Sequence, residues 1–70
     1  MTVKNRENAA VEENAWVGYC KSMSNAELLK AIAAWERALA YYRVARLPYS
    51  ERSIIKALEG AYTVRNARGL

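Results

Sequence analysis

The sequence predicts an all-α protein of three helices, in which a weaker N-terminal helix accompanies a long antiparallel helical hairpin. Helix-start signals stand at Ser24 and Ser50, and the apolar residues between them recur at alternating steps of four and three. Only residues 48–50 separate the second predicted helix from the third. So short a connection makes two consecutive helices fold back on each other, which predicts the hairpin.

A chain of 70 residues supports one domain at most. We expect residues 1–7 to form a flexible N-terminal segment and residues 8–70 to form a single helical domain. Asn8 is suited to cap a first helix that runs to Lys21. The apolar residues of this helix spread over most of its circumference, and Gly18 lowers its helix propensity. It is therefore the weakest of the three.

The second helix has the clearest start. Ser24 and Glu27 have the spacing of a capping box, in which the serine hydroxyl accepts from the Glu27 amide and the Glu27 carboxylate accepts from the Ser24 amide. Strong helix formers follow as far as Leu47. Pro48 then ends the helix, because proline lacks an amide donor and restricts the residue before it.

The third helix is predicted to begin near Glu51, with Ser50 as its N-cap and the Glu51 carboxylate beside the positive end of the helix dipole. It should run to about Arg68, where Gly69 provides the residue type that most often ends a helix. Gly60 lies inside this helix. A glycine there is tolerated, and it indicates close packing against another element.

The apolar pattern of the second helix predicts a homodimer. One seam of this helix steps by four and three through five large side chains: Leu28, Ile32, Trp35, Leu39 and Tyr42. A second apolar flank lies beside it, and a helix that is apolar on several sides must be covered from several directions. Small chains usually need a disulfide, a metal or a second subunit for stability. The single cysteine, Cys20, and the absence of histidine exclude the first two within one chain. We therefore expect a dimeric helical bundle with the seam in its oligomer interface.

The residue inventory argues against an enzyme. The chain has no histidine, no aspartate and one cysteine, and its seven glutamates show no catalytic spacing. Its three glycines are scattered, so no phosphate-binding loop is present, and we expect no cofactor and no metal. The sequence also lacks an apolar run long enough to span a bilayer and any targeting segment. We expect a cytoplasmic protein that does not interact with membranes.

Charge and aromatic residues point to a binding function. Residues 1–36 carry four basic and five acidic side chains, whereas residues 37–70 carry seven basic and two acidic ones. Five tyrosines and two tryptophans, with no phenylalanine, are the amphipathic rings that protein interfaces favour. The candidate partner-binding residues combine both features: Arg37, Tyr41, Arg43, Arg46, Tyr49, Arg52 and Tyr62.

Two functions remain open from the sequence. The first is a protein–protein interaction module that inhibits or modulates a larger host protein, either a regulator or an enzyme. In size and composition, although in no motif, the chain resembles the small helical accessory proteins of phages and mobile elements. The second is a small basic nucleic-acid-binding protein that uses the arginine-rich C-terminal half. Arginines near helix C-termini also complement the helix dipole, so charge alone does not decide between the two.

Overall fold

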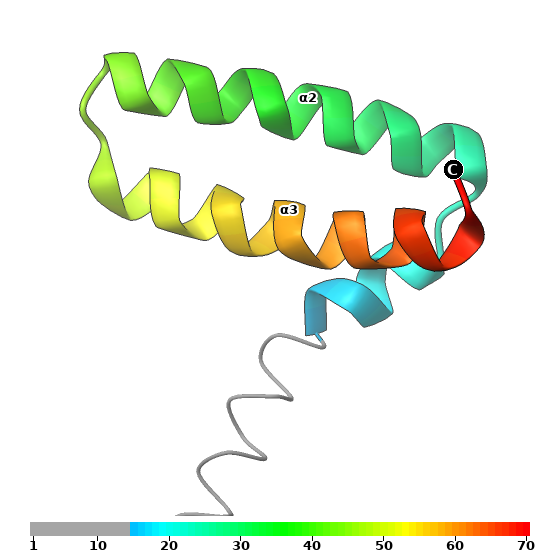
Figure 1. Cartoon of the computed structure of the whole chain (residues 1–70). Helices are drawn as coiled ribbons and strands as arrows, with labels where there is room; N and C mark the ends of the chain where they lie inside the picture. Colours follow the sequence, from blue (N-terminus) through cyan, green and yellow to red (C-terminus); the bar gives the residue numbers. More distant parts are fainter. Residues whose placement is uncertain (1–14) are drawn as a thin grey trace, which may run out of the picture.

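The computed structural model describes residues 15–70, and all regular structure in this part of the chain is helical (Figure 1). Residues 15–21 form an N-terminal helical segment, α2 spans Asn25–Val44 and α3 spans Pro48–Arg68. The predicted all-α class is therefore confirmed. The expected flexible segment 1–7 and the start of the first helix at Asn8 lie outside the described residues. Neither α2 nor α3 is apolar enough over a sufficient length to cross a membrane.

The predicted capping box at the start of α2 is confirmed. The Glu27 amide donates to Ser24 Oγ at 3.1 Å, and the Ser24 amide donates to Glu27 Oε1 at 2.8 Å. These bonds favour the charged carboxylate and lower the pKa of Glu27, the backbone bond contributing more than the side-chain bond. Two backbone amides that a helix start leaves without partners are satisfied in this way.

The connection between the helices differs from the sequence prediction. Helix α2 ends at Val44 and not at Leu47, because Arg46 adopts a left-handed conformation with φ 56°. The Leu47 amide then donates to the Tyr42 carbonyl at 2.9 Å, and the Arg46 amide donates to the Arg43 carbonyl at 3.2 Å. This pair of bonds is the Schellman arrangement that commonly closes helices.

The predicted start of α3 at Glu51 with a Ser50 cap is also wrong. Pro48 is the first residue of α3 and Leu47 is the N-cap, without a side-chain capping bond. Proline suits this position because the first helical amide has no partner within the helix and the proline φ is already helical. The end of α3 was predicted correctly: Gly69 adopts φ 73°, and its amide donates to the Asn66 carbonyl at 3.1 Å.

The core lies where α2, α3 and the N-terminal helical segment meet. Its buried side chains come from all three: Cys20, Leu28, Ile32, Leu58, Ala61 and Val64. Burial raises the pKa of the Cys20 thiol, and the Arg68 guanidinium opposes this effect. Cys20 thus serves as a small apolar core residue.

Polar contacts fix the two ends of the α2–α3 pair. At the connection, Arg43 Nε donates to Glu51 Oε1 at 3.0 Å. At the other end, Arg68 donates to the Lys21 carbonyl at 3.0 Å, to the Met23 carbonyl at 2.8 Å and to Asn25 Oδ1 at 3.0 Å. The end of α3 therefore lies beside the start of α2, as Figure 1 shows.

Gly60 marks the place where the N-terminal helical segment packs on α3. A Cβ atom built on Gly60 would lie 2.6 Å from the Trp16 Cβ and 3.0 Å from both the Trp16 carbonyl carbon and the Val17 amide nitrogen. No side chain fits in that space. The predicted close packing at this glycine is confirmed, and it fixes the position of Trp16.

Candidate functional site

Large apolar side chains are exposed at the end of the molecule where α2 connects to α3. The exposed fractions are 64% for Tyr41, 85% for Val44, 42% for Leu47 and 82% for Tyr49. We call these four residues the tip surface. Tyr41 also packs edge-on against Tyr42, with ring centroids 6.0 Å apart. Single exposed apolar residues are common, but four within residues 41–49 are typical of an interaction site.

Arginines surround the tip surface. Arg46 lies in the connection, and Arg37 and Arg52 lie within one helical turn of Tyr41 and Tyr49 respectively; all three are exposed. Arg43 is also largely exposed, although its guanidinium pairs with Glu51. The structure thus brings six of the seven predicted partner-binding residues to one end of the molecule.

Tyr62, the seventh predicted partner-binding residue, lies elsewhere. Its hydroxyl donates to Glu36 Oε2 at 2.6 Å, and the Arg65 guanidinium lies over its ring, 4.7 Å from the centroid. The bond to Glu36 is the largest cause of a raised pKa of Tyr62, followed by burial. Tyr62 therefore links α3 to α2 and is only partly available to a partner.

The seam predicted as an oligomer interface lies mainly inside the chain. Leu28 and Ile32 are buried by α3 and the N-terminal helical segment within the single chain, and the assignment of the seam to a subunit interface stays a prediction. Trp35 and Leu39 are half-buried against the same core, and Tyr42 is half-buried near the connection. Four-and-three spacing identifies a face that must be covered, but not whether the covering helix belongs to the same chain.

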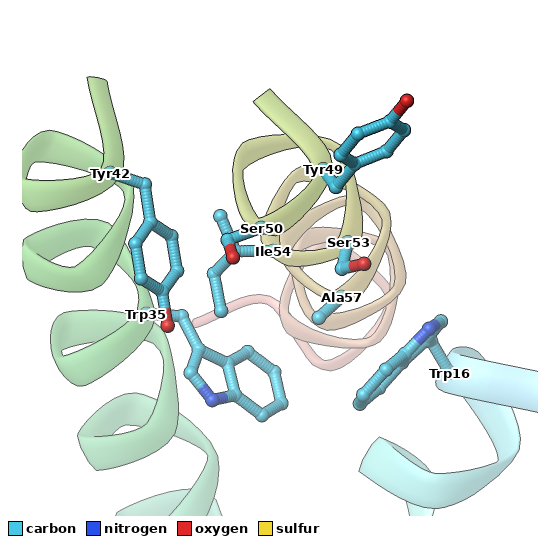
Figure 2. Close-up of a pocket in the computed structure, with 8 residues that line it drawn as sticks. All are labelled: Trp16, Trp35, Tyr42, Tyr49, Ser50, Ser53, Ile54 and Ala57. Atoms are coloured by element: carbon cyan, nitrogen blue, oxygen red, sulfur yellow. The ribbon is translucent and has the colours of Figure 1, made fainter. Parts of the chain in front are cut away.

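An open groove of about 330 Å³ extends from the tip surface toward the N-terminal helical segment (Figure 2). Figure 2 shows Tyr42 and Trp35 on α2 at one side, Trp16 at the other, and Ile54 and Ala57 of α3 between them. The Trp16 and Trp35 rings meet edge to face, with centroids 5.7 Å apart. We call this the aromatic groove. Its lining residues are Trp16, Trp35, Tyr42, Tyr49, Ser50, Ser53, Ile54 and Ala57.

A second hollow of about 450 Å³ shares Trp16 and Trp35 with the groove. It is lined by Ala15, Trp16, Tyr19 and Trp35, and Tyr19 packs edge-on against Trp16 at 6.0 Å. The sequence analysis did not identify either hollow. The only signal for them was Gly60, because the close contact at that glycine places Trp16 opposite Trp35.

Within residues 15–70, histidine, cysteine, aspartate and glutamate side chains form no group of three that is suited to hold a metal ion. Compared with protein-family models, with curated proteins and with solved structures, the chain shows no match in any of the three.

Proposed function

We propose that this chain is a protein–protein interaction module and that the tip surface is the part that contacts the partner. The observation that carries the proposal is the exposure of Tyr41, Val44, Leu47 and Tyr49 where α2 connects to α3. Tyrosine next to arginine is the composition of residues that dominate binding energy in protein interfaces. Because helices on both sides hold the tip surface, little conformational entropy is lost when a partner covers it.

The arginines further favour a protein partner over nucleic acid. Three of the seven basic residues in the C-terminal half already have intramolecular roles: Arg43 pairs with Glu51, Arg65 covers Tyr62 and Arg68 binds backbone carbonyls. Glu51 compensates the charge of Arg43, and the donors of Arg68 that bind carbonyls are no longer free to contact phosphates. The exposed apolar area of the tip surface, in contrast, gains free energy when a complementary apolar surface covers it.

We also propose what the protein does to its partner. A small binding module without catalytic groups acts by occupying a larger protein, so inhibition or modulation of a host regulator or enzyme is the proposed role, as in accessory proteins of phages and mobile elements. The buried Cys20 thiol is compatible with the reducing cytoplasm, where we place the protein.

The proposal includes a homodimer, which we place on the exposed side of α2. Leu29 is 46% exposed and belongs to the second apolar flank of α2, outside the tip surface. Light scattering after size exclusion should give twice the mass of the 7.9 kDa chain at micromolar concentration, and Leu29→Lys should shift it toward the monomer. A wild-type mass of 7.9 kDa under these conditions would contradict the dimer.

Capture of partners by variants tests the tip surface itself. The immobilised Tyr41→Ala/Tyr49→Ala protein should lose a captured host protein that the wild type retains after nuclease treatment, because truncation of central tyrosine anchors costs about 2 kcal/mol or more. Leu70→Ala is the control, since Leu70 is 44% exposed and belongs neither to the tip surface nor to the groove. Circular dichroism should show both variants folded. Equal capture by all three proteins would contradict the proposal.

Nucleic-acid binding is the second candidate, and one observation favours it: Arg37, Arg46 and Arg52 are exposed beside Tyr41 and Tyr49. Arginine with exposed aromatic rings is the combination that grips phosphates and stacks bases. This function predicts an affinity that falls steeply with salt. For each phosphate contact, a tenfold increase in salt concentration should lower the affinity about tenfold. If the chain binds a protein, its affinity for that partner should depend only weakly on salt, and the complex should persist after nuclease treatment.

A further inference from the structure

We propose that the aromatic groove binds a proline-rich segment of a partner protein in the extended polyproline II conformation, with acidic residues at the end of that segment nearest the tip surface. The inference rests on the proposed protein-binding function and names the chemistry of the bound segment. It adds a second contact site to the tip surface, and the two sites meet at Tyr49.

The shape and lining of the groove suit proline rings. Trp16 and Trp35 come from different elements, meet edge to face and line both hollows. Tyr42 extends the aromatic wall toward the connection (Figure 2), and Ala57 keeps the floor shallow. Proline-rich segments dock in aromatic-lined grooves of this kind because their conformation is already formed before binding.

The polar groups of the groove distinguish an extended segment from a helix. The residues that line the groove include three with hydroxyl groups, Tyr42, Ser50 and Ser53. None of these groups forms a hydrogen bond with another group in residues 15–70. A polyproline II segment has no internal hydrogen bonds, so its carbonyls need donors, whereas the backbone of a helix is already satisfied.

Charge sets the direction of the bound segment. No carboxylate lines the groove, and the nearest one toward the connection, Glu51, is paired with Arg43. Arg46 and Arg52 are exposed near the Tyr49 end. Acidic residues on the bound segment are therefore attracted to that end, where they also meet the N-terminus of α3 and its partial positive charge.

The test uses the whole chain labelled with ¹⁵N and a synthetic peptide of about eight prolines preceded by two glutamates, roughly 25 Å long in its proline part. Titration should shift the indole N–H resonances of Trp16 and Trp35 and the amide resonances of Ser53 and Ala57 in a saturable way. Replacing the two glutamates by lysines should weaken binding. A peptide with alanine at every proline position should not bind.

Two hydroxyl deletions provide the matched variants. Tyr42→Phe removes a groove hydroxyl and keeps the ring, so it should weaken peptide binding about fivefold, the worth of one hydrogen bond. Thr63→Val removes a hydroxyl on the exposed side of α3, outside both the groove and the tip surface, and should leave affinity unchanged. Ser53→Arg, at an exposed position on the groove wall, should block the peptide without unfolding the chain.

Three results would overturn the inference: no saturable shift at millimolar peptide, equal affinity for the alanine peptide, or tighter binding of an amphipathic helical peptide to the same resonances. Failure here is separable from failure of the proposed function. If Ser53→Arg still captures the host protein and Tyr41→Ala/Tyr49→Ala does not, then the tip surface binds a partner and the groove assignment alone is wrong.

Discussion

Replacing Leu28 by alanine is expected to lower the free energy of unfolding by about 3 kcal/mol, within the usual range of 2 to 5 kcal/mol for a buried leucine. Leu28 is fully buried, and it is the largest completely enclosed side chain among the described residues. Its truncation removes the transfer free energy of the side chain and leaves a cavity between α2 and α3. A chain of this length has about 4 to 10 kcal/mol of stability in total, so a large part would be lost.

Urea denaturation followed by circular dichroism measures this effect, at one fixed protein concentration because subunit association also contributes to stability. Leu70→Ala is the control. Leu70 is 44% exposed, so its truncation should cost less than about 1 kcal/mol. If the two variants are equally destabilised, or if Leu70→Ala is the more damaging, then Leu28 is not enclosed between the helices as described.

Replacing Gly60 by alanine is expected to destabilise the protein by about 1 to 3 kcal/mol, although glycine to alanine inside a helix ordinarily stabilises it. The reversal follows from geometry, because the new methyl group would lie 2.6 Å from the Trp16 Cβ and 3.0 Å from backbone atoms of Trp16 and Val17. The backbone cannot move aside as a flexible side chain does. The N-terminal helical segment must therefore shift away from α3.

Tryptophan fluorescence together with thermal denaturation detects this change, since Trp16 and Trp35 would separate when the segment moves. Gly18→Ala is the matched control. Gly18 is also helical, but a Cβ there would meet nothing within 4 Å, so the substitution should stabilise the protein by about 0.4 to 1 kcal/mol. Stabilisation by both substitutions would show that the segment does not pack on Gly60 in solution.

The local signals in the sequence predicted the fold well where the deciding interactions are local. The capping box between Ser24 and Glu27 and the left-handed Gly69 each involve residues a few positions apart. The predicted start of the third helix was wrong, because Pro48 and Ser50 are both helix-start signals and they lie only two residues apart. Proline at the first helical position prevailed, since Leu47 and Arg46 close α2 with backbone bonds that need no special side chain.

One part of the candidate site could be predicted from the sequence and the other part could not. The tip surface was largely predictable, because Tyr41 and Tyr49 flank the short connection between the second and third helices that the sequence predicts. The aromatic groove was not, since Trp16 and Trp35 meet only through the long-range contact at Gly60. The sequence also could not predict that the chain itself buries Leu28 and Ile32, because periodicity does not reveal which helix covers a seam.

The tip surface is the central claim, and site-specific photo-crosslinking in cells tests it most directly. A photoreactive phenylalanine analogue at position 49, where the native tyrosine is 82% exposed, should form a covalent adduct with one discrete protein. The same analogue at position 63, exposed on α3 away from the connection, should form no such adduct. Adducts with nucleic acid at position 49, or identical protein adducts from both positions, would contradict the assignment of the tip surface as the protein-binding site.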